Sequence, residues 1–222
     1  MAKIVWDKPG EHYYETGVRN GVLYVHDGEN YGAGIAWNGL TAITESPSGA
    51  EATPLYADDI KYLNLVSAEE FGATIEAYTY PEEFAACNGE AELVPGVTVG
   101  QQDRKVFGLC YRTTVGNDAK SNAYGYKLHL IYGALAAPSE RAYSTINDSP
   151  EAITFSWEVS TTPVNVEIEG KTFKPTSYIC IDAVKVGEAK MKLLENKLYG
   201  TEEAEAALPM PSEIYEMIGA QG

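Results

Sequence analysis

The chain holds little of what most enzymes, metal proteins and nucleic-acid binders depend on. Sixteen lysines and arginines stand against 32 acidic residues among 222, giving a formal net charge of −16. The basic residues form no cluster of the kind that grips a phosphate backbone, which disfavours a conventional nucleic-acid-binding protein. No apolar run approaches the roughly 18 residues that a membrane helix needs, and the N-terminal stretch has no signal-peptide pattern. We therefore expect synthesis in the cytoplasm, no classical secretion and no membrane association.

Motifs that would place catalysis or a metal ion are also missing. The histidines and cysteines are His12, His26, His129, Cys87, Cys110 and Cys180. None of them stands in an HxH, HExxH or CxxC arrangement, and no GxSxG nucleophile elbow occurs. We expect the cysteines to be small buried side chains in a reducing compartment, and the His129 ring to meet a neighbouring strand or water. The sequence thus predicts no enzyme, no catalytic residue, no metal site and no cofactor.

The adjacent carboxylates of Asp58 and Asp59 are the most suggestive polar feature, within "TPLYADDIKYLNLV". Adjacent side chains on a strand point to opposite faces, so one metal ion could not readily take both. In a turn they could share an ion, but no further ligand is apparent. We interpret the pair as a polar interruption or bulge within a β-hairpin.

What the chain does have is alternation of apolar with other residues. A period of two, which indicates half-buried strands, runs through residues 71–77, 105–114, 126–132 and 152–160. Residues 67–70 match a helix capping box, yet alternation follows them and we favour a strand. Residues 164–173 predict two short strands turning at Gly170, and residues 177–186 predict the last strand. The spacing of turn signals favours an antiparallel sandwich or barrel.

Helical patterns are few and short. Residues 81–89 predict one short helix that ends at Gly89. Residues 188–200 place Met191, Leu194 and Leu198 on one stripe, and residues 201–209 and 211–219 predict two further helical turns. The predicted organisation is a mainly β domain over residues 22–187 with a short flanking helix, an N-terminal arm over 1–21 and a C-terminal helical extension over 188–222.

Two features of the composition point toward assembly. Sixteen tyrosines against five phenylalanines suit surfaces that become half-buried in wide interfaces. Residues 41–100 contain eleven acidic residues and one base, Lys61, so this stretch carries −10 of the net charge. Such a stretch repels a polyanion.

A resemblance to a known family is carried by several long segments. They are "GIAWNGLTAITESPSGAEATPLYADDIKYLNL", "FGATIEAYTYPEEFAACNG", "RKVFGLCYRTTVGND", "YKLHLIYGALAAPSERAYSTINDSPEAITFSWEVSTTPV" and "SYICIDA". In this order they resemble the major tail protein of long-tailed, non-contractile bacteriophages, which is the tail-tube subunit. The resemblance covers most of residues 5–187 and is least informative after residue 187.

The resemblance implies a tail-tube type of β-sandwich or barrel. It implies six-membered rings that stack head to tail around a tape-measure protein, in a virion tube that conducts DNA during ejection without binding it specifically. Its partners would be further copies of the chain, the tape-measure protein, and tail-terminator and distal tail or baseplate proteins. We expect part of the acidic stretch to line the lumen.

The residues expected to serve assembly fall into two groups. A loop expected to contact a neighbouring ring or subunit comprises Glu45, Ser46, Pro47, Ser48, Gly49, Ala50, Glu51, Asp58 and Asp59. An N-terminal arm expected to become ordered on assembly would make contacts through Trp6, Tyr13 and Tyr14. Two alternative functions remain open: a carbohydrate-binding β-sandwich, whose exposed aromatic rings would stack on sugars, and a tail-terminator or distal tail protein of the same virion.

Overall fold

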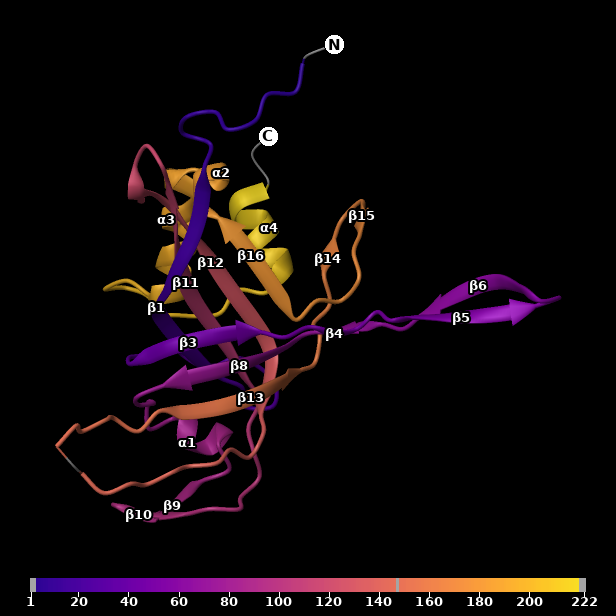
Figure 1. The fold of residues 1–222 in the computed structure, drawn as a ribbon. Coiled ribbons are helices and arrows are strands. Elements are labelled where there is room, and N and C mark those ends of the chain that lie inside the picture. Colours follow the sequence, from indigo (N-terminus) through magenta and orange to yellow (C-terminus); the bar gives the residue numbers. More distant parts are fainter. Residues whose placement is uncertain (1–2, 147, 220–222) are drawn as a thin grey trace.

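The computed structural model describes residues 3–146 and 148–219, and its largest element is one antiparallel sheet (Figure 1). Seven strands follow one another in the order β2-β1-β11-β12-β13-β8-β3, and β16 pairs with β12 off this path. Their bounds are β1 (Tyr13–Val25), β2 (Ile35–Trp37), β3 (Leu40–Glu45), β8 (Gly72–Ala77), β11 (Phe107–Asn117), β12 (Ser121–Ala136), β13 (Phe155–Thr161) and β16 (Tyr178–Asp182). The predicted mainly β class with an antiparallel sheet is confirmed.

The sheet turns a corner within its longest strand, β12. Residues 127–131 of this strand pair with β16, whereas residues 134–136 pair with β13. Between the two pairings lies Gly133, at φ 59°, where an added Cβ would meet the carbonyl oxygen of Thr162 at 2.1 Å. Only glycine fits so close a backbone approach. The corner brings β13, β8 and β3 across the strands β1, β11 and β12 (Figure 1).

Alternation along the strands divides the apolar residues between two cores. On β12, Leu128 and Leu130 face one core while Ile131 faces the other, and on β1, Leu23 points away from Val22 and Tyr24. The first core lies between the two halves of the sheet and contains Trp37, Ile75, Phe84, Leu109 and Trp157 among its largest members. The second core lies between the main sheet and the helices. The alternation predicted for residues 126–132 is therefore confirmed, and that predicted for residues 152–160 is confirmed from Phe155 on, where β13 begins.

Helices α2 (Ala183–Val186), α3 (Glu188–Tyr199) and α4 (Pro211–Gly219) cover the second core (Figure 1). Helix α1 (Phe84–Cys87) packs in the first core instead. The predicted stripe of Met191, Leu194 and Leu198 on α3 is buried. The hydroxyls of Tyr24 and Tyr132 donate to carbonyls of the C-terminal segment, so residues 188–219 complete the core of the sheet. Helices of the described chain are too short or too polar to cross a lipid bilayer.

Four short ribbons lie outside the main sheet. They pair β4 (Ser48–Gly49) with β7 (Glu69–Glu70), β5 (Ala52–Ala57) with β6 (Ile60–Val66), β9 (Ala91–Val94) with β10 (Val97–Val99), and β14 (Glu167–Ile168) with β15 (Lys171–Thr172). Of residues 67–70, where a strand was favoured over a helix, only Glu69 and Glu70 form a strand, β7. The predicted turn at Gly170 is confirmed, since its φ is 74° between β14 and β15.

Several expectations were wrong in detail. Residues 201–209 form no helix, because the carbonyl of Ala206 accepts from the Gly34 amide and the Ala207 amide donates to the carbonyl of Lys197. The last strand ends at Asp182, whose carboxylate caps α2. Cys180 is exposed, whereas Cys87 and Cys110 are buried as expected.

The segment predicted to form an N-terminal arm, residues 1–21, is only partly outside the sheet. Residues 13–21 belong to β1 and lie in the main sheet. Of the described residues, those before Tyr13 run outside the sheet (Figure 1). Residues from Tyr13 on are therefore already ordered as a strand, and the prediction of ordering on assembly applies only to the residues before Tyr13.

Candidate functional site

Between β3 and β8 the chain leaves the sheet, runs outward and returns as a two-stranded ribbon. We call residues 46–71 the arm. The ribbon pairs β4 with β7 near the sheet and β5 with β6 farther out, and it projects well beyond the body of the molecule (Figure 1). Every residue from 46 to 70 is exposed. An isolated two-stranded hairpin is at best marginally stable in water, so the arm is a segment that a partner would stabilise.

Asp58 and Asp59 form the turn at the tip of the arm. They have φ values of 52° and 64°, and Ala57 pairs with Ile60 across them. Two consecutive residues with positive φ in a two-residue loop form a type I′ turn, a conformation that aspartate tolerates better than most residues. The pair lies within a β-hairpin, as interpreted from the sequence, but it makes the hairpin turn itself and is not a bulge.

The arm carries apolar side chains on both faces. Leu55 pairs with Leu63, and Leu65 follows two residues later, so these three side chains share one face. We call them the leucine face. Tyr56 and Tyr62 on the same two strands are also exposed. Monomeric proteins rarely expose contiguous apolar patches of this kind unless they bind something.

The residues expected in the assembly loop are distributed along the arm and do not form one compact site. Glu45 ends β3, Ser46 and Pro47 lead out of the sheet, and Ser48 and Gly49 form β4. Ala50 and Glu51 precede β5, and Ala50 has φ 54°. Asp58 and Asp59 lie at the far tip.

A polar and aromatic cluster lies where the arm meets the sheet. Its members are Glu45, Phe71, Tyr111, His129 and Tyr178, and we call them the root cluster. The Tyr111 hydroxyl donates to the Glu45 carboxylate at 2.6 Å. The Tyr178 hydroxyl lies 2.7 Å from Nδ1 of His129, and the Tyr178 ring stacks on Phe71 with centroids 4.9 Å apart. Tyr111 stacks on His129 at 4.6 Å. Glu45, which directly precedes the arm, and Phe71, its last residue, thus meet one cluster.

Hydrogen-bond roles in the cluster define the proton position on His129, whose side chain is 7% exposed. The Thr113 hydroxyl donates to Glu15, so its oxygen accepts from Nε2–H of His129 at 2.8 Å. Nδ1 then accepts from Tyr178. Burial lowers the pKa of His129 although Glu45 and Glu15 face the ring, so the neutral ring is the form that these contacts hold. As predicted, the ring meets neighbouring strands.

The expected N-terminal contact residues lie apart from the arm. Trp6 is 74% exposed and precedes β1. Tyr13 and Tyr14 lie in β1 and already have partners within the chain: the Tyr13 ring packs against Tyr124 at 5.0 Å, and the Tyr14 hydroxyl donates to Asn122 at 2.7 Å.

The outer face of β3, β8 and β13 is polar and acidic. The residues that point away from the first core are Ala42, Thr44, Thr74, Glu76, Ser156, Glu158 and Ser160. These three strands contain no lysine or arginine. We call this surface the acidic face.

Comparisons with known proteins give little further constraint. No family model matches the chain, and no curated protein does. Among solved structures, a chain of the sheath–tube complex of PVC, an extracellular contractile injection system, aligns with a TM-score of 0.32 and 13% identity. The alignment covers 74% of this chain and 89% of that one. The sheath/tube terminator of the same system aligns with a TM-score of 0.27 and 12% identity, over 72% and 96%. Likeness at these values carries no conclusion about function.

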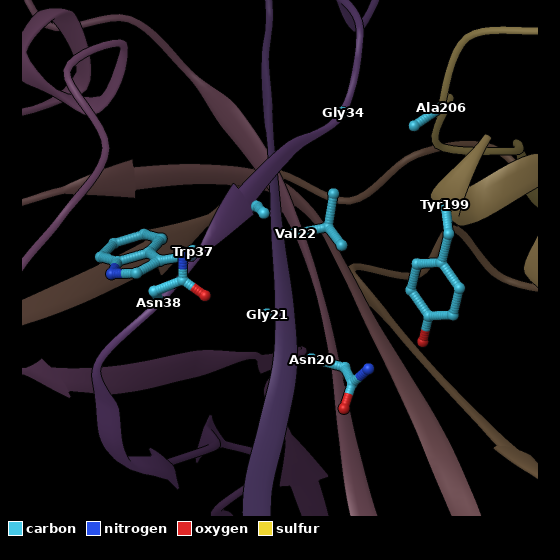
Figure 2. Close-up of a pocket in the computed structure, with 9 residues that line it drawn as sticks. Asn20, Gly21, Val22, Gly34, Trp37, Asn38, Tyr199 and Ala206 are labelled. Carbon is cyan, nitrogen blue, oxygen red and sulfur yellow. The ribbon is translucent and has the colours of Figure 1, made fainter. Parts of the chain in front are cut away.

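A cavity of about 330 Å³ lies beside β2 and the end of α3 (Figure 2). Asn20, Asn38 and Tyr199 supply its polar side chains, and the rest of its lining is Gly21, Val22, Gly34, Ala36, Trp37 and Ala206. Burial raises the pKa of Tyr199. The lining offers no carboxylate, imidazole or amine, and the hydroxyl of Tyr199, with its raised pKa, is its one titratable group. Nor does the described part of the chain bring together three histidine, cysteine or acidic side chains that could hold a metal ion.

The sequence predicted a loop and hairpin within the arm, but it did not predict the root cluster. Glu45 and Tyr111 are 66 residues apart in sequence, and His129 and Tyr178 are 49 apart. The only signal in the sequence was the unusual position of a histidine within an otherwise apolar alternation.

Proposed function

We propose that this chain is a structural subunit that polymerises into a tail tube, as six-membered rings stacked head to tail. The observation that carries the proposal is the arm, with its apolar residues held away from the body of their own molecule. The resemblance of the long sequence segments to tail-tube subunits supports the same role.

The physical argument begins with the cost of exposing the arm. Burying apolar area contributes about 25 cal/mol per Å², and the leucine face offers three such side chains in addition to the tyrosines. A second copy of the chain is the partner that a homopolymer supplies in unlimited number. An arm that inserts into a different surface of the next subunit makes a heterologous contact, which is the kind that builds open-ended filaments.

The acidic face supports the conduit part of the proposal. In a tube that conducts DNA we assign it to the lumen, where Glu76 and Glu158 repel phosphates and the small hydroxyl side chains offer no cationic grip. Glu76 belongs to the acidic stretch of residues 41–100, whereas Glu158 does not. The tube would enclose a tape-measure protein and end against tail-terminator and distal tail or baseplate proteins, within a virion assembled in the bacterial cytoplasm.

The experiment compares the full chain with an arm-truncated variant. Residues 50–68 are replaced by Asn-Gly, which closes a two-residue turn between the paired ends of β4 and β7. Because the removed residues are exposed, the variant is expected to keep the circular dichroism spectrum and melting temperature of the body. We expect rings or tubes of the full chain in negative-stain electron microscopy across a concentration series, and none of the variant. Tubes formed equally well by the variant would contradict the proposal.

A further inference from the structure

We propose that the root cluster fixes the direction of the arm relative to the sheet, so that Tyr178 and His129 act as positioning residues for arm-mediated assembly. The inference rests on the proposed function, because it supposes that the arm is the assembly contact. It adds to that function a set of residues at the base of the arm that determine its direction.

The first step is that the arm has little else to hold it. Its outer strands β5 and β6 pair with each other, and the ribbon projects away from the body (Figure 1). The Ala50 amide donates to the Ala68 carbonyl within the ribbon, and one backbone bond ties the base of the arm to the sheet, from the Ser46 amide to the carbonyl of Gly72 at the start of β8. A two-stranded ribbon twists and bends readily. Contacts that set its angle to the sheet must therefore come from outside the ribbon.

The second step is that the root cluster supplies such contacts from three other strands. Tyr111 belongs to β11, His129 to β12 and Tyr178 to β16. Tyr111 holds the outgoing segment through Glu45, while Tyr178 holds the returning segment through the stack on Phe71. The Thr161 hydroxyl on β13 also donates to the Phe71 carbonyl at 2.6 Å. Gripping both segments from different strands restrains rotation as well as displacement.

The third step is that His129 locks Tyr178 in place. Its Nδ1 accepts from the Tyr178 hydroxyl, and its Nε2–H is fixed by Thr113. One face of the ring stacks on Tyr111, with an interplanar angle of 4°. A buried imidazole with both nitrogens bonded has one favoured orientation. The hydrogen bond to His129 restrains the Tyr178 ring, and the Tyr178 ring in turn restrains the Phe71 ring stacked on it.

The chemistry of the cluster differs from ordinary core packing. A pair of aromatic rings alone would hold Phe71 by area, but it would leave the hydroxyl of Tyr178 without a role. Hydrogen bonds add directional restraint, since their strength falls steeply with angle. The prediction is therefore that removing single oxygen atoms, without removing apolar volume, loosens the arm.

The experiment measures the direction of the arm in the monomer. Spin labels are placed on cysteines at Lys61→Cys, near the arm tip, and Glu158→Cys, on the acidic face, in a Cys180→Ser background. Cys87 and Cys110 are buried and are not expected to react. Double electron–electron resonance then gives the distribution of distances between the arm and the sheet.

Tyr178→Phe removes the hydroxyl and keeps the ring on Phe71. We expect the loss of one buried hydrogen bond to raise the population of reoriented arms about five- to tenfold, with a broader distance distribution and a lower yield of sedimentable assemblies. Glu45→Ala should act in the same direction. Glu45→Gln keeps an oxygen acceptor for Tyr111 and should restore the parental distribution in large part.

The matched control is Tyr31→Phe, which also removes one tyrosine hydroxyl, the acceptor of the Gly133 amide, on the side of the second core. It should leave the distance distribution unchanged. Unchanged distributions in both Tyr178→Phe and Glu45→Ala would overturn the inference, as would equal broadening by Tyr31→Phe. The two proposals fail separately: a parental protein that never forms rings or tubes refutes the proposed function, whereas the distances in the monomer test the root cluster directly.

Discussion

The leucine face allows the contribution of the arm to assembly to be worked out in advance. Leu65, on the arm, and Leu193, on α3, are each 56% exposed. Burying a whole leucine side chain contributes about 1.5–3 kcal/mol. Just over half of each remains to be buried, so a partner that covers Leu65 gains about 1–1.5 kcal/mol from it. Leu65→Ser removes this gain and Leu193→Ser removes an equal area elsewhere.

We expect Leu65→Ser to raise the concentration needed for assembly about five- to tenfold. Leu63→Ser with Leu65→Ser should raise it roughly 30-fold or more, since each side chain adds its own term. Because both residues are exposed in the monomer, the free energy of unfolding should change by no more than about 0.5 kcal/mol per substitution.

The assay is sedimentation of assembled protein over a concentration series, with thermal melts of the unassembled protein alongside. Leu193→Ser should assemble as the parent does. An equal effect of Leu193→Ser and Leu65→Ser would refute the reasoning, because general loss of surface hydrophobicity would then explain both. Assembly of the double variant at the parental concentration would refute it as well.

Three further outcomes are expected. Burial lowers the pKa of His129 below its ordinary 6.5. The unfolded chain therefore binds the proton more readily, and the free energy of unfolding falls as the pH drops through and below that value. His129→Gln should flatten the dependence of melting temperature on pH between about pH 5 and 7, and an unchanged slope would count against the buried neutral ring. Glu76→Lys with Glu158→Lys should leave the fold intact and slow DNA release from virions built with the variant, whereas unaltered ejection kinetics would argue that the acidic face lies outside the lumen. Trp6→Ser should leave the melting temperature unchanged, because the side chain is exposed, but reduce assembly if the segment before β1 makes contacts there; normal tube yield would exclude it.

Local periodicity accounts for the strands that could be predicted. Leu128, Leu130 and Ile131 were assigned to opposite faces correctly because each face of β12 meets a different core. The α3 stripe was found for the same reason, since a 3.6-residue period needs no knowledge of the partner surface. Periodicity does not reveal which surface an apolar face packs against, so the packing of Met191 and Leu194 on the sheet could not be predicted.

The turn at Asp58 and Asp59 shows why the arm was only half predicted. A type I′ turn is signalled in sequence by Asn-Gly or Asp-Gly, and here both positions hold aspartate. Apolar residues on both faces of β5 and β6 also resemble a buried strand, although all of them are exposed. The root cluster was beyond prediction from one sequence, because its contacts join residues 45, 71, 111, 129 and 178 through the folded sheet.

The second core joins the sheet to helices that are synthesised last, so the arm leaves the ribosome before this core can form. Its last buried member is Ile214 on α4, so this core is not complete until the chain as far as α4 has left the ribosome. At about 5–20 residues per second, the roughly 140 residues between Phe71 and Ile214 take about 7–30 s to synthesise. Throughout that interval an apolar ribbon is present on a body that is not yet folded, and neighbouring chains on one messenger RNA carry the same ribbon. The charges of Asp58, Asp59 and Lys61 interrupt its apolar sequence, in the manner of residues that keep exposed strands from premature pairing.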